Sequence, residues 1–282
     1  MSTRKQRIDV FRDTQDWIFE DPDLFAALDA AKQNTEVFFE EDYPMFDARK
    51  KKQNTEITVT RDKSFQAAMR LHKEKPYTKI AVMNFANAFH PGGGVTSGCT
   101  AQEESLCRIS TLYPLLARPS LKQSYYKYHN DLNSVKATDA LIYTEGVVIC
   151  KTDDDLPVRM PKEDWVTVDV ITIAAPDLRK YKNPHVPISK GGSYMSKAEL
   201  FACHVKRAIH MLTCAASKNA DILVLGAFGC GAFENDPQVV ARAYKTALEE
   251  FPKVFMKVEF AVYCSEEDSR NYDIFKEILE EK

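Results

Sequence analysis

Asn84-Phe-Ala-Asn-Ala-Phe-His-Pro-Gly-Gly-Gly-Val-Thr-Ser-Gly-Cys-Thr-Ala-Gln-Glu-Glu104 is the most informative stretch of this 282-residue chain. It begins in an apolar run, residues 79–85, that is typical of a buried strand, and it leads into a helical pattern. Three adjacent glycines cost backbone entropy on folding, so a bare connection seldom needs them. They allow the main chain to approach a ligand and to direct N–H groups at an anion. The stretch therefore predicts a strand–loop–helix unit with a binding site in its loop.

A second unit with the same outline occurs later in the chain. Residues 222–225 predict a strand, Gly226–Phe233 forms a second glycine loop, and Asp236-Pro237 opens a helix with an acid as N-cap and proline as first residue. Neither loop is followed by Gly-Lys-Ser/Thr, and neither fits G-x-G-x-x-G. One such loop is equally well explained as a tight turn that lets a helix pack closely on a sheet. Two loops in one chain favour a pair that grips both sides of an anionic ligand.

The rest of the chain continues the alternation of strands and helices. Apolar runs predict central strands at residues 141–150 and 166–174, and the second run is continuous enough to be covered on both faces. A loop at residues 180–194 precedes a long helix at 196–217, and a last strand is expected at 258–263. These elements predict an α/β fold with a central mixed sheet between two layers of helices.

Local sequence also predicts several element boundaries. Apolar residues at helical spacing indicate one continuous helix over residues 101–116. Ser64 is expected to cap a helix at 64–74, and Ser265 is expected to cap the last helix. Asp153-Asp154-Asp155 reads as a solvated turn.

The N-terminal part of the chain differs in pattern from the rest. Residues 1–75 contain two amphipathic helices, the second opened by Asp21-Pro22, and two short β-branched or aromatic runs at 36–39 and 57–60. They are expected to form a cover or a sheet edge. With no linker in the sequence, we predict a single domain over residues 1–282, in which residues 1–75 are an N-terminal helical extension.

Composition limits the classes of function. Hydrophobic residues make up 44% of the chain and charged residues 28%, as in a folded globular protein, and the formal net charge is −3. Direct nucleic-acid binding is not expected, because no basic surface is indicated, so an anionic ligand must be held in a pocket. Seven cysteines without a C-x-x-C pair favour a reducing cytoplasm over a disulfide framework or a zinc site. The sequence contains no signal core or membrane-spanning run, so no membrane association is predicted.

The first glycine segment resembles the signature of the microbial-type poly(ADP-ribose) glycohydrolases, in which three glycines, a short spacer and Gln-Glu-Glu follow one another. Here Gly92-Gly93-Gly94 is followed by the seven residues Val95–Ala101 and then by Gln102-Glu103-Glu104. Gly229–Phe233 and Ala174-Ala-Pro176 extend the resemblance, which covers nearly the whole chain. It implies a macrodomain fold and an enzyme that needs no cofactor and releases ADP-ribose from poly(ADP-ribose), attacking polymer ends.

The resemblance also implies residue roles. Glu104 matches the catalytic acid, and Glu103 matches the acid that hydrogen-bonds the ribose hydroxyls. The other matching positions are expected to contact substrate: Asn87 and Phe233 beside the distal ribose; Gly92, Gly93, Gly94, Val95 and Gln102 in the first segment; Gly226, Gly229, Cys230 and Gly231 in the second loop. Asp177 is a candidate for the adenine side, and a turn-forming role explains it equally well.

The expected chemistry can also be argued from the residues themselves, without the family resemblance. Breaking a ribosyl C–O bond builds positive charge at the anomeric carbon, and one carboxylic acid can protonate the leaving oxygen and then, as a carboxylate, activate water. Adjacent residues of a helix differ in direction by about 100°, so Glu103 and Glu104 are not expected to flank the sugar on opposite faces. The plainer interpretation of Glu103 is a capping box, Thr100-Ala-Gln-Glu103, at a helix N-terminus.

Two other functions stay open on the sequence alone. One is a non-catalytic reader of ADP-ribosylated partners, and the other is a hydrolase of mono-ADP-ribose linkages. The acidic pair favours an enzyme, because a reader has no need of it. No metal site is predicted, since His90 has no second ligand at suitable spacing, and no base is identifiable beside Cys99 or Cys230 for thiolate chemistry.

Overall fold

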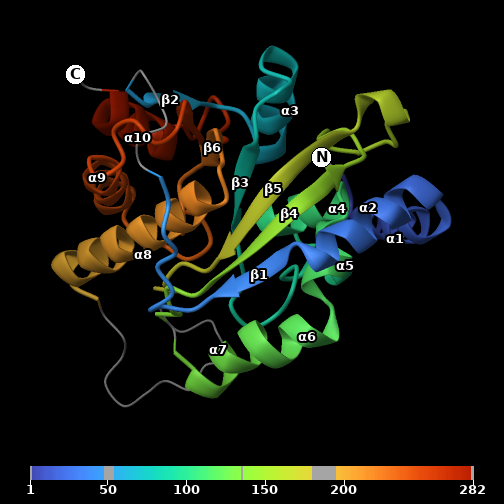
Figure 1. Cartoon of the computed structure of the whole chain (residues 1–282), viewed down its shortest axis with the longest axis horizontal. Helices are drawn as coiled ribbons and strands as arrows, with labels where there is room; N and C mark the ends of the chain where they lie inside the picture. The colour runs from blue at the N-terminus through green and yellow to red at the C-terminus, as the bar shows by residue number, and fades with distance from the viewer. Residues whose placement is uncertain (1, 48–53, 135, 180–194, 281–282) are drawn as a thin grey trace.

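The computed structural model describes residues 2–47, 54–134, 136–179 and 195–280, and its core is a seven-stranded mixed sheet (Figure 1). The predicted loop 180–194 lies outside the described residues. The strands are β1 (Thr35–Phe38), β2 (Glu56–Thr60), β3 (Ile80–Phe85), β4 (Leu141–Ile149), β5 (Val166–Ile173), β6 (Ile222–Leu225) and β7 (Lys257–Ala261). Their order is β1-β4-β5-β3-β6-β7-β2. β1, β4 and β5 pair antiparallel, and the pairs from β5 to β2 are parallel.

Helices cover both faces of the sheet, which confirms the three-layer α/β fold. The α-helices are α1 (Arg4–Glu20), α2 (Pro22–Gln33), α3 (Ser64–Glu74), α4 (Gln102–Arg108), α5 (Leu112–Leu116), α6 (Pro119–Leu121), α7 (Lys127–Leu132), α8 (Lys197–Ser217), α9 (Pro237–Leu248) and α10 (Arg270–Glu280). Short 3-10 helices span Val95–Ser97 and Lys162–Asp164, and a π-helical turn spans Lys122–Tyr126. One core cluster joins the sheet to α1–α5 and the other joins it to α8–α10, on the opposite side in Figure 1. Neighbouring strand residues divide between the clusters, Val82 in one and Met83 in the other, because side chains alternate across a strand.

The first 75 residues supply helices and also the two edges of the sheet. α1 is capped by Thr3 through a capping box with Gln6, and α2 is capped by Asp21, as its sequence predicts. β1 pairs with β4 at one edge, and β2 pairs with β7 at the other. No helix of the described ranges is both long enough and apolar enough to cross a membrane.

The helix predicted over residues 101–116 is interrupted, so this prediction was wrong. α4 ends at Arg108 and α5 begins at Leu112. Between them the main chain turns to the end of β4, where Cys150 N–H donates to Ile109 O at 3.0 Å and Thr111 N–H donates to Val148 O at 3.0 Å. These tertiary hydrogen bonds replace the helical ones, and apolar periodicity does not reveal them.

Three local predictions were also wrong. Ser64 is the first residue of α3 and Lys63 its N-cap, because the Ser64 hydroxyl accepts a hydrogen bond from Gln102. Ser265 does not cap α10, which begins at Arg270; its hydroxyl closes a local turn by accepting from Asp268 N–H. Asp153 is buried and forms an ion pair with Lys63 at 3.1 Å, so this part of the acidic run is not solvated.

Candidate active site

Both glycine loops emerge at the carboxyl edge of neighbouring parallel strands. The first loop follows β3, the second follows β6, and β3 pairs with β5 on its other side. The carboxyl ends of parallel strands open on one edge of a sheet, which is where ligands bind in α/β folds. Gly226 packs against the end of β3, and a Cβ there would lie 2.8 Å from the ring of Phe85. The sheet therefore places the two loops side by side.

The acidic pair stands in the first turn of α4, folded against the first glycine loop. Glu103 and Glu104 are 3% and 7% exposed. The main-chain N–H groups of Asn87 and Gly92 donate to Glu103 at 2.7 and 3.2 Å, and that of Gly94 donates to Glu104 at 2.8 Å. A Cβ at Gly93 would lie 2.6 Å from Glu104 Oε1 and 3.2 Å from Glu103 Oε2. Both carboxylates thus meet the same face of the loop, and only glycine fits between them.

The first loop differs from the expectation that its N–H groups point at an anionic ligand. Besides the bonds to the acids, Gly93 N–H donates to His90 O and Val95 N–H donates to Gly92 O, each at 3.1 Å. Every N–H from Gly92 to Val95 therefore already has an acceptor within the protein. The loop orients the acids, and contact of these residues with substrate stays a prediction.

Burial dominates the electrostatics of Glu103 and raises its pKa to about 8. The hydrogen bonds from Asn87, Asn84 and Gly92 lower this pKa, and the adjacent charge of Glu104 raises it further. Asn84 is fully buried at the end of β3, and its Nδ2 lies 3.3 Å from Glu103 Oε1 and 3.2 Å from Thr172 Oγ1. Burial therefore favours the protonated form of Glu103 near neutral pH.

Gln102 ties α4 to the strand beneath it. Its Oε1 accepts from Phe85 N–H at 2.9 Å, and its Nε2 donates to Met83 O at 2.7 Å and to Ser64 Oγ at 3.0 Å. The carboxamide is engaged at both ends by protein groups. This places Gln102 as a support for the acids, while its predicted contact with substrate stays untested.

The second loop has the free donors that the first lacks. Among the described residues, the main-chain N–H groups of Gly229, Gly231 and Ala232 have no acceptor. A Cβ at Gly231 would meet nothing within 4 Å, so packing does not require glycine there. An N–H-rich loop that leads into the N-terminus of α9 suits an anion. Cys230 sits in this loop, and burial raises the pKa of its thiol well above the ordinary value, which disfavours a thiolate.

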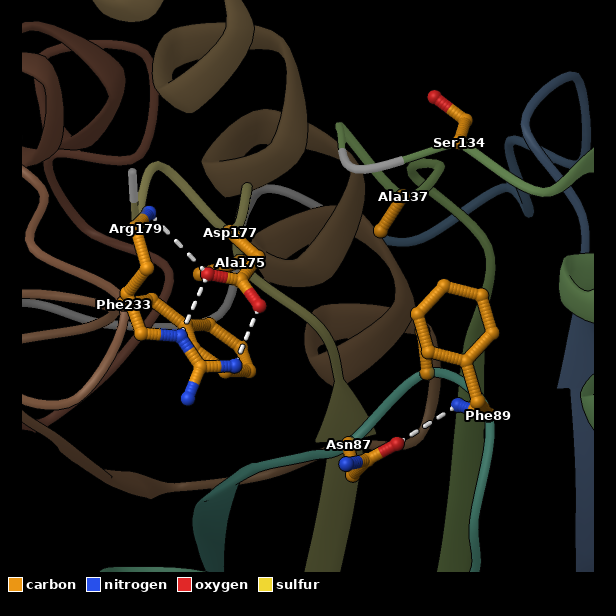
Figure 2. A pocket seen from close by; sticks show the side chains of 9 residues that line it. Asn87, Phe89, Ser134, Ala137, Ala175, Asp177, Arg179 and Phe233 are labelled. Atoms are coloured by element: carbon orange, nitrogen blue, oxygen red, sulfur yellow. Dashed lines mark hydrogen bonds and ion pairs between the residues drawn. The ribbon is translucent and has the colours of Figure 1, made fainter. Parts of the chain in front are cut away.

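A pocket opens beside the first loop, and Figure 2 shows Asp177, Arg179 and Phe233 on one side of it and Asn87 and Phe89 on another. Its lining consists of Asn87, Ala88, Phe89, Ser134, Ala137, Ala175, Asp177, Arg179 and Phe233. Asn87 Oδ1 accepts from the N–H groups of Phe89 and His90 at 2.8 and 3.0 Å. Its Nδ2 has no acceptor within the described part of the chain, and it is free to donate to a ligand.

One wall of this pocket is built by residues far apart in the sequence. Arg179 Nε donates to Asp177 Oδ1 at 2.7 Å, and the guanidinium carbon lies 5.1 Å from the centre of the Phe233 ring. Leu178 N–H donates to Phe233 O at 3.0 Å and joins the two segments. Asp177, expected on the adenine side, therefore lines the same pocket as Asn87 and Phe233.

Sequence reasoning missed three residues of this region. Asn84 begins the glycine motif and had no predicted role, although a polar residue ending an apolar strand is a usable signal. No sequence pattern pointed to Arg179. Its two partners are Asp177, which lies in a loop, and Phe233, which is distant in the sequence. Asn235 precedes the cap of α9, and its burial beneath the second loop is visible only in the structure. No group of three His, Cys, Asp or Glu side chains in the described ranges is arranged to hold a metal ion.

Known proteins share the fold of this chain. Residues 19–152 match the family model described as the catalytic domain of microbial-type PARG, or poly(ADP-ribose) glycohydrolase. No curated protein matches the chain. Among solved structures, the glycohydrolase of Thermomonospora curvata superposes with a TM-score of 0.82 at 27% identity, over 97% of this chain and 99% of that one. The same protein bound to the inhibitor ADP-HPD gives 0.80 at 28% identity, over 95% and 97%.

A second organism extends the comparison. The poly(ADP-ribose) glycohydrolase of Deinococcus radiodurans in complex with ADP-ribose superposes with a TM-score of 0.75 at 34% identity. The alignment covers 90% of this chain and 97% of that one. The acidic pair, the two glycine loops and the sheet that joins them thus stand in a shared framework, and the chain belongs to the microbial-type poly(ADP-ribose) glycohydrolases.

Proposed function

We propose that this glycohydrolase cleaves the ribose–ribose O-glycosidic bond of poly(ADP-ribose) with Glu104 as its single acid/base and Glu103 as the group that positions the ribose. The observation that carries these roles is the clamp on the acids: both carboxylates are held by N–H groups of the first glycine loop, on one face of it. They cannot act from opposite faces of a sugar. One acid that works twice fits this geometry better than an acid and a separate nucleophile.

The reaction needs two proton transfers, one from Glu104 and one to it. Glu104 gives its proton to the leaving ribose oxygen as the C–O bond breaks, and the bonding electron pair leaves with that oxygen. Positive charge develops at the anomeric carbon. The Glu104 carboxylate then takes a proton from water, whose oxygen bonds to the anomeric carbon. One water is consumed, two hydroxyl groups are formed, and Glu104 regains its proton.

The structure supports a division of the ligand between the two loops. We place the diphosphate of ADP-ribose on the N–H groups around Gly229 and Gly231, since these donors have no acceptor among the described residues and the space beside the Gly231 Cα is open. The distal ribose then lies between Asn87 and Phe233, which line one pocket, and the main-chain N–H of Asn87 is bonded to Glu103. The Deinococcus radiodurans protein was solved in complex with ADP-ribose, which supports ADP-ribose as the ligand.

Attack at polymer ends is supported by the position of α1. Arg4 Nε donates to Ser97 O at 2.7 Å, and Arg7 Nε donates to Gly98 O at 2.8 Å, so α1 is fastened to the segment that follows the three glycines. A Cβ at Gly98 would lie 2.8 Å from Arg4 O, which shows how closely the two backbones approach. A helix in this place closes one side of the first loop to a continuing polymer.

We also infer a single catalytic domain and a cytoplasmic enzyme. The first 75 residues supply both edge strands of the sheet, which supports one domain. All seven cysteines are free thiols, which suits a reducing compartment.

Purified poly(ADP-ribose), with chromatography of the products, tests the assignment. The wild-type protein is expected to release ADP-ribose, and Glu104→Gln to lose at least ~10²-fold in turnover, because the amide cannot transfer the proton. Glu259→Gln is the matched control: Glu259 is also a buried glutamate, but it lies in β7 and pairs with Arg70. Near-normal hydrolysis by a folded Glu104→Gln variant would rule out the acid/base role. A wild-type protein that binds ADP-ribose and cleaves no polymer would rule out the proposed function.

A further inference from the structure

We propose that Asn235 is a positioning residue that holds the second glycine loop in the shape that binds the ADP-ribose diphosphate. The inference rests on the proposed function of this loop. Asn235 is 2% exposed and lies behind the loop, so it supports the site without reaching the substrate.

The Asn235 side chain joins two separate segments of the chain. Its Nδ2 donates to Pro176 O at 2.8 Å, to Gly229 O at 3.1 Å and to Phe233 O at 3.2 Å. Its main-chain N–H also donates to Gly229 O, at 3.0 Å. An amide has two hydrogens for these three carbonyls, so one hydrogen is shared. A single side chain thus closes the loop from Gly229 to Phe233 and ties it to Pro176.

These contacts fix the parts of the site that are expected to touch ligand. Pro176 stands between Ala175 and Asp177, which line the pocket together with Phe233. Gly229 carries one of the free N–H groups assigned to the diphosphate. Loss of the Asn235 carboxamide would release the pocket wall and the anion-binding loop together.

The backbone on both sides of the clamp needs such support. Glu234, next to Asn235, has φ 57°, a left-handed conformation that is unfavourable for a residue with a side chain. Gly229 has φ 75°, and a Cβ there would lie 2.8 Å from Asn235 Nδ2 and 2.7 Å from the Ala175 Cβ. Such conformations persist where surrounding contacts over-determine them. The bonds of Asn235 provide those contacts.

A buried histidine bonds to the oxygen of the same carboxamide. Asn235 Oδ1 lies 2.9 Å from His204 Nε2, and His204 is 2% exposed on α8. The three carbonyls require the amide nitrogen on their side, so the oxygen faces the ring and Nε2 must be the donor. Burial lowers the pKa of His204 to about 4, so its ring is neutral under ordinary conditions. The neutral ring, protonated at Nε2, completes the hydrogen bonds of Asn235.

The test compares four variants by ADP-ribose calorimetry, steady-state kinetics on poly(ADP-ribose) and thermal melting. Asn235→Ala is expected to weaken ADP-ribose binding by about 10- to 100-fold, the range for one or two lost hydrogen bonds to a binding loop. KM should rise accordingly, while kcat falls less, because the acids are held by the other loop. His204→Ala should weaken binding by roughly 3- to 10-fold, and His204→Gln should recover most of it, since its amide N–H can replace Nε2–H.

His210→Ala is the matched control. His210 lies on the same helix, is fully buried, and bonds to the main-chain oxygens of Asp139 and Asp42 at 2.8 and 2.9 Å, away from both loops. It is expected to lower the melting temperature and leave ADP-ribose affinity unchanged.

Each outcome decides one question. Unchanged affinity and KM in folded Asn235→Ala would overturn the inference, and so would a His204→Gln variant no better than His204→Ala. The histidine pair keeps the test decisive if Asn235→Ala does not fold. Failure of the wild type to bind ADP-ribose would instead count against the proposed function.

Discussion

Replacing Glu103 with glutamine should make the protein less stable in acid and more stable in alkali. The reason is the site's own electrostatics: burial raises the pKa of Glu103 to about 8, far above the 4.5 of an exposed glutamate. A carboxyl group whose pKa is raised by folding binds its proton more tightly in the folded state. The folded state therefore loses stability as pH rises from the unfolded pKa through the folded one.

The size of the effect follows from the two pKa values. At about 1.36 kcal/mol for each pH unit between 4.5 and 8, ionisation of Glu103 costs the folded state roughly 5 kcal/mol at alkaline pH. Glutamine carries no charge and escapes this cost. It has one acceptor oxygen in place of two, however, so one of the donors from Asn84, Asn87 and Gly92 loses its acceptor, at about 1–3 kcal/mol at any pH.

The two contributions predict a crossing of the stability curves. At pH 5 the Glu103→Gln variant should unfold about 1 kcal/mol more easily than the wild type, because a small part of the ionisation cost is already present there, and at pH 9 it should be about 3 kcal/mol more stable. Urea unfolding of both proteins at the two pH values measures this difference. A stability difference that changes by less than about 1 kcal/mol between pH 5 and pH 9 would refute a strongly raised pKa for Glu103. Turnover should fall in the variant at both pH values, because Glu103 is proposed to position the ribose; at pH 9 the wild type gives up stability for that function.

Three further changes test separate parts of the site. Gly231→Val should leave the melting temperature unchanged, because a Cβ there meets nothing, yet it should weaken ADP-ribose binding by about 10- to 100-fold in calorimetry as the side chain fills the anion site. Arg4→Ala combined with Arg7→Ala should release α1 and produce early oligomers, seen by chromatography at low conversion; products that remain monomeric would contradict its role in end selection. Arg179→Ala removes the cation above Phe233 and should weaken ADP-ribose binding by about 2- to 30-fold, and unchanged affinity would show that the wall does not depend on it.

Much of the fold could be predicted from the sequence, because its strands are apolar and its helix starts are marked. The expected strand at residues 141–150 is found at Leu141–Ile149, and Asp236 caps α9 ahead of Pro237 as predicted. The errors arise where a distant group takes over a local one. The helix expected over residues 101–116 is interrupted where its main chain forms hydrogen bonds with the end of β4. Hydrogen bonds of this kind do not change the apolar periodicity of the sequence.

Sequence reasoning could predict which segments meet at the site, but not how the individual groups within them are oriented. Strand–loop–helix units in a parallel sheet bring their loops to one edge, so the two glycine loops could be placed together from the sequence pattern. The direction of individual N–H groups could not, because it depends on φ and ψ within the loop. Nor could the bonds of Asn235, which join residues up to 59 positions apart.

The two loops divide the work in a way that favours catalysis. Since the first loop gives its N–H groups to Glu103, Glu104 and its own carbonyls, folding fixes the acids before any substrate arrives. A preorganised site of this kind spends no substrate-binding free energy on orienting its catalytic groups. The same hydrogen bonds favour the charged form of Glu103, yet burial outweighs them and keeps the pKa near 8. The anionic part of the substrate is then left to the second loop, whose main-chain donors are not used by the acids. A single loop that served both purposes would have to divide its N–H groups between the acids and the diphosphate, and separation into two loops removes that competition.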